Sequence, residues 1–498
     1  MKNMIIKSAK YLAVAGLTLG ATSCLDLDPV VFDKIAPENF FQTEEDAKAA
    51  VTAIYSPFQT GWGGGYFNCW VGSYLMLNNL TTDDLGLTRT DLEVVEKFQW
   101  TSTTSQVSGH YSNLIKEVSK ATLLMDDLQQ SPISEEAKQG FIAQVQCARA
   151  QYLFMLYDFY GTAGVVTDPE ILRNPENEVI LERMSQDEFV KLIESDLKAA
   201  AAVLPVSWQA NDWGRFTKGA AYAILTKLYM QEKRWSDAEA ACREIMKLGY
   251  ELQDDYQSVF AVENEKNSEI IWAIPCLAEG GEGQMWMTHI VPPGYPLKNN
   301  NIQRWFVHIT PWRFYDKYEK GDERLKSLVG EYKIWDAEKG DSVLQTRENC
   351  SYLERGALPF KYPEDPKQTT EMSGNDVVVY RYADVLLELA ECINEQQGPT
   401  AEAIGFVEQI RARVGVPNSI PAAATAGKEA FRDYILDESG RELFCEGHRR
   451  RNLIRHGKFI STAQEEGYFT AKDHMVLFPL PQSILDESQG KIKQNPGY

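Results

Sequence analysis

The chain has 498 residues, of which 44% are hydrophobic, so it is long enough to enclose a large apolar core. Its formal net charge of −21 at pH 7 argues against nucleic acid and anionic membrane surfaces as partners, because both repel an acidic protein. The eight cysteines include no Cys-x-x-Cys pair, which excludes a zinc ribbon and a thioredoxin-like redox motif.

The N-terminus predicts a lipoprotein export signal. Three lysines precede an apolar stretch at 11–20, and the small residues 21–23 then lead to Cys24. In lipoprotein processing, a thiol directly after small residues accepts a diacylglyceryl group, whereas an ordinary secretory peptide would carry the cysteine by chance. We expect 1–23 to be a signal peptide, Cys24 to be lipidated and 24–39 to be an acylated linker. No later run is long and apolar enough to cross a membrane.

Capping signals and apolar spacing predict helices through the first half of the mature chain. Thr43 precedes Asp46, and Ser185 precedes Glu188, by the three-residue spacing of a capping box. Apolar residues recur at helical spacing over 145–159. Helices therefore dominate the prediction for this part of the chain.

Two stretches have the internal spacing of a tetratricopeptide repeat, in which a small residue of the second helix allows two helices to approach closely. We expect Ser236 and Glu239 to cap the second helix of the first match, and 141–160 with 185–204 to form a degenerate pair. Because the matches are not contiguous, they predict a scaffold of helical hairpins with long insertions. The matching residues are Leu225, Tyr229, Lys233, Trp235 and Ala238, then Ala390, Asn394, Gly398, Thr400 and Ala403.

Two glycine- or proline-rich insertions, at 61–74 and about 280–312, carry many large aromatic residues without a helical period. The apolar face of a pyranose ring packs flat on Trp or Tyr, while its hydroxyls need polar partners. The alternatives are that the rings fix the insertions to the scaffold, or that the ligand is a peptide. The residues expected to contact ligand are Trp62, Tyr66, Trp70, Trp286, Tyr295, Asn300, Trp305 and Trp312. Polar neighbours in sequence are Asn68, Asn78, Asn79, Asp83, Asp84, Lys298, Asn299, Asn301 and Arg304.

Catalytic motifs are missing from the sequence. It contains no HExxH, no GxSxG and no P-loop, and its six histidines include no i, i+4 pair. Carboxylates are too numerous for any pair to stand out as that of a glycoside hydrolase. We therefore expect no catalytic site, no metal and no cofactor. The run of acids and arginines at 438–457 could form an active site, but it more often forms an ion-pair network between helices.

From this run outward, the chain resembles the SusD/RagB family of surface nutrient-binding lipoproteins, and the resemblance extends from end to end. The matching motifs, in chain order, are Phe40-Phe41, Thr43–Ala47, Asp83-Asp84, Arg149-Ala150, Phe159–Gly161, Gly214-Arg215, Lys218–Ala221, Glu269–Trp272, Gly321-Asp322 with Arg324, Arg381–Leu387 with Ala390-Glu391 and Asn394, Phe478–Pro481 and Gln494–Tyr498. Three residues depart from the family pattern. Ser439 stands where the family usually has Arg, Asn452 where it usually has Asp, and Lys120 near a usual Asn.

The resemblance implies a mainly all-α fold with four tetratricopeptide-like helical hairpins and long irregular insertions. It also implies one domain over 40–498, with an N-terminal part at 40–260 and a C-terminal part at 261–498. Family members are lipid-anchored in the outer membrane at the cell surface, as lids on a TonB-dependent barrel of the SusC type. They mainly bind glycans, or peptides in the RagB branch, and are not enzymes. The leading hypothesis is therefore capture of a glycan and its delivery to a barrel transporter. The alternatives are peptide capture and a surface glycoside hydrolase.

Overall fold

The structure is a computed structural model that describes residues 41–59, 64–174, 176, 181–279, 281–416 and 420–498. The predicted signal peptide, the lipidation residue Cys24 and the linker at 24–39 lie outside these ranges. Trp62, one of the predicted ligand contacts, lies outside them as well.

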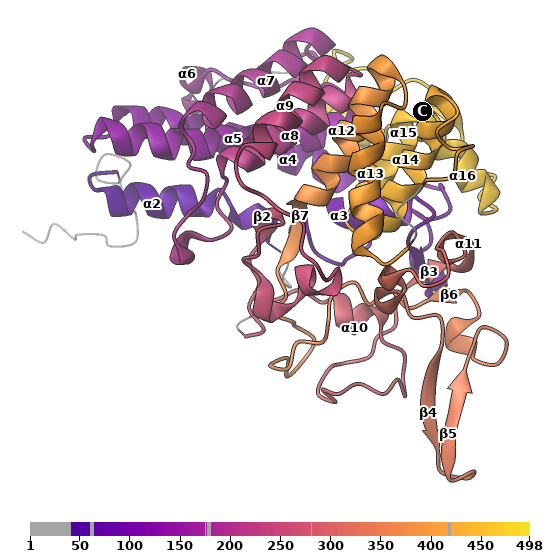
Figure 1. Ribbon diagram of the computed structural model, residues 1–498. Helices are drawn as coiled ribbons and strands as arrows, with labels where there is room; N and C mark the ends of the chain where they lie inside the picture. The colour runs from indigo at the N-terminus through magenta and orange to yellow at the C-terminus, as the bar shows by residue number, and fades with distance from the viewer. Residues whose placement is uncertain (1–40, 60–63, 175, 177–180, 280, 417–419) are drawn as a thin grey trace, which may run out of the picture.

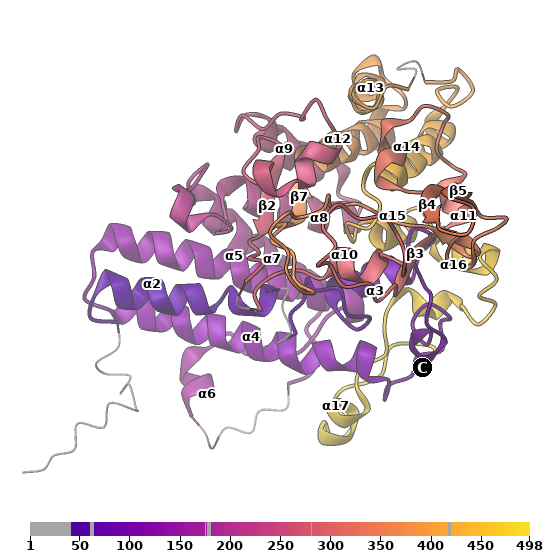
Figure 2. The same cartoon turned by 90° about the horizontal axis from the view of Figure 1, so that it is seen from below.

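Long helices form the body of the molecule, and helices that follow one another along the chain pack side by side (Figure 1). Helix α2 lies beneath α4 and α5 and packs against both (Figures 1 and 2). The mainly α-helical class is confirmed, while the grouping into four tetratricopeptide-like units stays a prediction. The long helices are α2 (Glu44–Ala53), α4 (Ser105–Gln130), α5 (Glu135–Tyr160), α7 (Gln186–Val203), α8 (Lys218–Gln231), α9 (Trp235–Met246), α12 (Tyr382–Gln397), α13 (Ala401–Arg413) and α14 (Lys428–Glu442).

The strands build an irregular part of the molecule, most of which lies below the helical body in Figure 1, and short helices lie both there and within the body. The short helices are α3 (Tyr74–Leu80), α6 (Pro169–Arg173), α10 (Trp286–Ile290), α11 (Trp312–Tyr315), α15 (Arg449–Arg455), α16 (Phe459–Glu465) and α17 (Gln482–Glu487). Three antiparallel sheets are described: β1 (Gly86–Leu87), β3 (His308–Pro311) and β6 (Gly356–Ala357) in the order β1-β3-β6; β2 (Ile270–Ile274) with β7 (Val377–Arg381); and β4 (Tyr332–Asp336) with β5 (Asp341–Gln345).

The predicted caps have mixed outcomes. Thr43 and Ser185 both form complete capping boxes, so these two helix starts are confirmed. The predicted cap at Ser236 is wrong, because α9 begins one residue earlier and has no side-chain cap. The backbone N–H of Arg234 donates to the carbonyl of Tyr229 (2.8 Å). This bond closes the preceding turn and places Ser236 inside the helix.

One contiguous apolar core joins the two halves of the chain. Its buried members run from Ala47 to Leu480. The pairing of β1 with β3 and the packing of α9 against α12 both cross between the halves. The domain limits at 40, 260 and 498 stay a prediction. Within the described ranges, no helix is both long and apolar enough to span a membrane.

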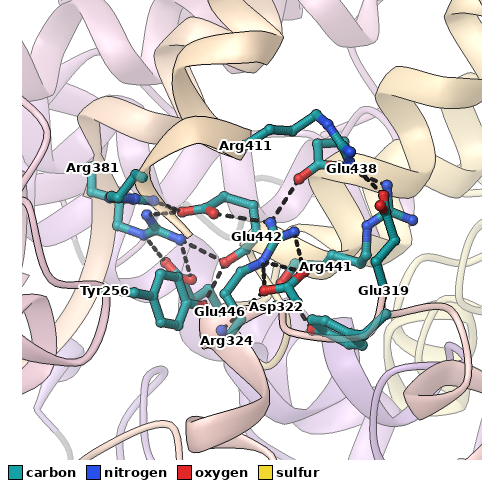
Figure 3. A network of polar contacts seen from close by, with 12 residues as sticks. Tyr256, Glu319, Asp322, Arg324, Arg381, Arg411, Glu438, Arg441, Glu442 and Glu446 are labelled. Carbon is teal, nitrogen blue, oxygen red and sulfur yellow. Dashed lines mark hydrogen bonds and ion pairs between the residues drawn. The ribbon is translucent and has the colours of Figure 1, made fainter. Parts of the chain in front are cut away.

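A buried network of arginines and carboxylates surrounds the C-terminal end of α14 (Figure 3). The Arg381 guanidinium contacts Glu269, Glu442 and Glu446, each at 2.7 Å. Arg324 contacts Asp322 and Glu438, also at 2.7 Å. These side chains are at most 1% exposed, so each charge depends on its partners for solvation. The prediction that 438–457 forms an ion-pair network is confirmed.

Two of the three departures from the family pattern contact each other. The side-chain amide of Asn452 donates to the hydroxyl of Ser439 (2.9 Å), and both residues are buried. A neutral hydrogen bond therefore satisfies both buried polar groups. The third departure, the exposed Lys120, pairs with the largely buried Glu117 (2.8 Å).

Candidate functional site

The two aromatic insertions meet at a pocket of about 450 Å³. This volume falls within the range of small-molecule sites. A larger hollow of about 530 Å³ near the C-terminus has no aromatic lining. The first pocket therefore matches the predicted chemistry better. Its lining residues are Cys69, Trp70, Val71, Arg89, Leu92, His289, Trp305 and Val307.

Local hydrogen bonds hold the first insertion in place. The Asn68 side chain accepts from the backbone N–H of Trp70 (2.8 Å) and donates to the carbonyl of Gly65 (2.7 Å). The backbone N–H of Ser73 donates to the carbonyl of Trp70 (2.8 Å), and the Ser73 hydroxyl caps α3. These contacts fix the backbone on both sides of Trp70, whose side chain is 38% exposed.

The second insertion is tied to α10 and to β1. The backbone N–H of Trp305 donates to the carbonyl of Thr288 (2.9 Å), and that of Val307 donates to the carbonyl of His289. The backbone N–H of Thr88 then donates to the carbonyl of Val307 (2.9 Å). Backbone hydrogen bonds therefore join both ends of the second insertion to the segment that follows β1, which lies more than 200 residues earlier in the chain.

Three rings lie together in one wall of the pocket. The Trp70 and Trp305 ring centroids are 6.2 Å apart, with an interplanar angle of 42°. The His289 ring centroid lies 5.4 Å from each of them. Rings fixed in this way offer an apolar surface that can pack against the C–H face of a sugar.

Polar groups of two kinds accompany the rings. At the rim, the Arg89 guanidinium pairs with the Asp91 carboxylate (2.7 Å), and both side chains are exposed. In the wall, burial lowers the pKa of His289 to about 3; nearby His308 adds to this shift, while the backbone at Cys69 opposes it. The imidazole is therefore neutral near pH 7, and neither of its ring nitrogens has a hydrogen-bond partner among the described residues. Because His289 is 1% exposed and both ring nitrogens are buried, this ring supports the two tryptophans from behind and does not face the solvent.

Trp286 and Tyr66 are corrections to the predicted ligand contacts. Trp286 is 1% exposed, and its indole N–H donates to the carbonyl of Pro359 (2.7 Å). Tyr66 is 6% exposed and lies against Tyr152, with ring centroids 6.1 Å apart. Neither ring presents a face to solvent, so both belong to the core.

Three other predicted contacts lie outside the pocket. Tyr295 packs between Tyr332 and Phe360, with centroid distances of 4.8 Å to each. The Arg347 guanidinium lies 4.0 Å from the ring centroid of Trp312 and covers that ring. Asn300 is exposed and accepts from Arg304 (3.4 Å). Of the predicted aromatic contacts in the described ranges, Trp70 and Trp305 are the pair that the structure brings together.

Several polar neighbours from the sequence analysis have structural roles instead. The Asp83 carboxylate pairs with Arg449 (2.8 Å), and the side-chain oxygen of Asn79 accepts from the backbone N–H of Gly447 (2.8 Å). Asn68, Asn78 and Asp84 are also buried. The pocket is lined instead by Arg89 and His289, which the sequence did not mark. Arg89 lies outside both insertions, and His289 belongs to no histidine motif.

Comparisons with known proteins agree with the fold. The model described as "SusD family" matches residues 268–498, and the model described as "Starch-binding associating with outer membrane" matches 78–230. SusD-like protein P25 from Formosa agariphila is 28% identical over 93% of this chain and 94% of its own length.

Two solved structures show the same architecture. A laminarin binding SusD-like protein superimposes with a TM-score of 0.76 at 23% identity, over 92% of this chain and 100% of that one. Surface glycan-binding protein A from Bacteroides thetaiotaomicron, in complex with laminarihexaose, gives a TM-score of 0.72 at 21% identity, over 91% and 99%. The motifs, the two family models and the shared fold lead to one conclusion: the chain belongs to the SusD/RagB family.

Proposed function

We propose that this protein captures a glycan in the pocket between Trp70 and Trp305 and does not hydrolyse it. The observation that carries the proposal is that two partly exposed tryptophans from separate insertions line one pocket of about 450 Å³. Among the described residues that line the pocket, none is a carboxylate, whereas glycoside hydrolysis generally uses two. The descriptions of related proteins as binders of starch and laminarin agree with a glycan ligand.

The lining chemistry favours a neutral sugar. Trp70 and Trp305 supply surface for the apolar face of a pyranose ring, while the exposed Arg89 guanidinium at the rim supplies hydrogen-bond donors to its hydroxyls. Because Arg89 and Asp91 are already paired, the rim does not require a charged ligand. We therefore expect neutral plant, algal, fungal or host polysaccharides to bind more tightly than strongly anionic ones.

The site of action follows from the N-terminal sequence and the family. We propose that lipid on Cys24 holds the protein on the outer membrane at the cell surface. There it would pass its glycan to a TonB-dependent barrel of the SusC type. The matching family model, described as "Starch-binding associating with outer membrane", supports this location.

Substitution of Cys24 with alanine is expected to abolish lipid labelling and to release the protein from membranes, because no other cysteine follows an export signal. The measurements are incorporation of labelled palmitate and fractionation of cells that express the variant. Ser23→Ala keeps a small residue at the cleavage site and is the matched control. A Cys24→Ala protein that still labels and still fractionates with the outer membrane would refute the anchor.

Binding is tested with an array of plant, algal, fungal and host polysaccharides, with peptides as a separate panel. Trp70→Ala and Trp305→Ala should each weaken binding of the best polysaccharide by roughly 5- to 150-fold, or about 1–3 kcal/mol. Their melting temperatures should stay close to that of the wild type, because each ring is partly exposed. Phe469→Ala, which removes a ring that is 74% exposed elsewhere, is the control.

Three results would contradict the proposal. One is wild-type affinity in both tryptophan variants. Another is binding confined to the peptide panel. The third is release of shortened sugars during prolonged incubation of the pure protein with the bound polysaccharide.

A further inference from the structure

The β4–β5 hairpin projects away from the body of the molecule (Figure 1). Within it, Trp335 lies opposite Ser342, and Lys333 lies opposite Leu344. Side chains two residues apart on a strand share a face, so these four residues lie on the same face of the hairpin. Trp335 is 68% exposed and Leu344 is 39% exposed.

Trp335 contributes little to the core, because most of its side chain is in water. The hairpin itself is positioned at its base, where Tyr332 is buried and packs against Tyr295 with centroids 4.8 Å apart. An isolated two-stranded hairpin is at best marginally stable, so this anchor matters. The structure therefore holds an exposed tryptophan out from the body on a ribbon fixed at one end.

The size of this apolar surface suits a sugar ring better than a protein. On the hairpin, Trp335 and Leu344 are the large hydrophobic side chains that the described structure leaves exposed. A stable protein interface needs about 800 Å² from each partner, which two side chains do not supply. One pyranose ring needs only a single indole face. Beside that face, the side chains of Lys333 and Ser342 can form hydrogen bonds with the hydroxyl groups of the sugar.

The hairpin lies on the same side of the molecule as part of the pocket. Both α10, which carries His289, and the hairpin lie below the helical body in Figure 1, and both face the viewer in Figure 2. Tyr295, which anchors the base of the hairpin, lies in the segment that follows α10. At about 3.3 Å per residue, Trp335 lies roughly 10 Å along the strand from that base.

We propose that Trp335 is a second glycan contact, which binds a distant part of the same polysaccharide chain that occupies the Trp70–Trp305 pocket. This inference rests on the proposed function of that pocket. Once one part of a chain is held, contact with a second part becomes intramolecular and raises the overall affinity. A short oligosaccharide fills the pocket alone and gains nothing from the hairpin. Trp335 therefore selects for chain length.

The experiment compares two probes: the polysaccharide that ranks first on the array and its own trisaccharide. Trp335→Ala should weaken binding of the polysaccharide by roughly tenfold or more and leave the affinity for the trisaccharide unchanged. Trp335→Tyr keeps an aromatic face and should retain most of the polysaccharide affinity. Phe469→Ala is the control for loss of an exposed ring, and Trp70→Ala should weaken binding of both probes. Melting temperatures establish that each variant is folded.

The outcomes separate the two proposals. If Trp335→Ala binds the polysaccharide like the wild type while Trp70→Ala does not, the hairpin contact is refuted and the pocket stands. If Trp335→Ala weakens binding of both probes equally, selection for chain length is refuted. If Trp335→Ala leaves polysaccharide binding intact but abolishes co-purification with a barrel protein, the hairpin contacts protein instead. A wild-type protein that binds no polysaccharide on the array contradicts both proposals.

Discussion

Substitution of Glu442 with alanine is expected to lower the free energy of unfolding by about 3–5 kcal/mol, measured by chemical denaturation. Glu442 is fully buried and contacts Arg381 (2.7 Å), Arg324 (3.2 Å) and Arg413. Its removal leaves three buried guanidinium groups with fewer partners, and the lost solvation is not replaced by water. We expect the affinity for glycan per folded molecule to remain unchanged.

The control for this variant is Glu402→Ala. Glu402 pairs with Arg243 (3.0 Å) at the surface, where such pairs contribute at most about 1 kcal/mol.

The pH dependence of the free energy of unfolding gives a second test of the role of Glu442. Burial raises the pKa of Glu442, but Arg413, Arg381 and Arg324 outweigh burial and hold the pKa well below its usual value near 4.5. The charged form therefore stabilises the fold above pH 4.5, and this contribution is lost as the pH falls further. Glu442→Ala should lose less stability than the wild type on acidification; a fully stable variant that loses ligand binding would overturn the structural role.

Substitution of Trp286 with alanine is also expected to cost about 3–5 kcal/mol of stability, without a separate loss of ligand affinity. The Trp286 ring fills the core beside His308, and its N–H satisfies the carbonyl of Pro359. Alanine leaves a cavity and removes the donor to that carbonyl. Melting temperature and binding of the best polysaccharide should be measured together.

The paired measurement separates core rings from ligand-binding rings. Trp286→Ala should lower the melting temperature and leave the affinity of the folded protein unchanged. Trp70→Ala should lower the affinity and leave the melting temperature nearly unchanged. Trp286→Phe keeps most of the ring volume and should recover part of the stability. A Trp286→Ala protein with wild-type stability and selectively weakened binding would contradict the core role of Trp286 and indicate that this residue contacts the ligand.

Local sequence signals predicted the helical scaffold well. The boxes at Thr43 and Ser185 depend on residues three positions apart, so they can be read without tertiary contacts. The ion-pair network was also predictable, because buried arginines and glutamates need each other as partners. The start of α9 was not, because it depends on how tightly the turn before Arg234 closes.

The site was only partly predictable. Composition indicated that both insertions carry rings suited to sugar binding, and Trp70 and Trp305 do meet at one pocket. The sequence did not distinguish them from Trp286, because exposure depends on the short helix α10 and on the segments packed over it. Arg89 and His289 have no local pattern that marks them. They reach the pocket through the pairing of β1 with β3 and the backbone bonds of Trp305 and Val307.

The most direct test of the account is a calorimetric titration of the double variant Trp70→Ala/Trp305→Ala with the trisaccharide of the best polysaccharide. The trisaccharide is the probe of choice because it does not depend on Trp335. The account predicts an unchanged melting temperature and an affinity at least as weak as that of the weaker single variant. A folded double variant that binds the trisaccharide with wild-type affinity would contradict the assignment of this pocket as the glycan site.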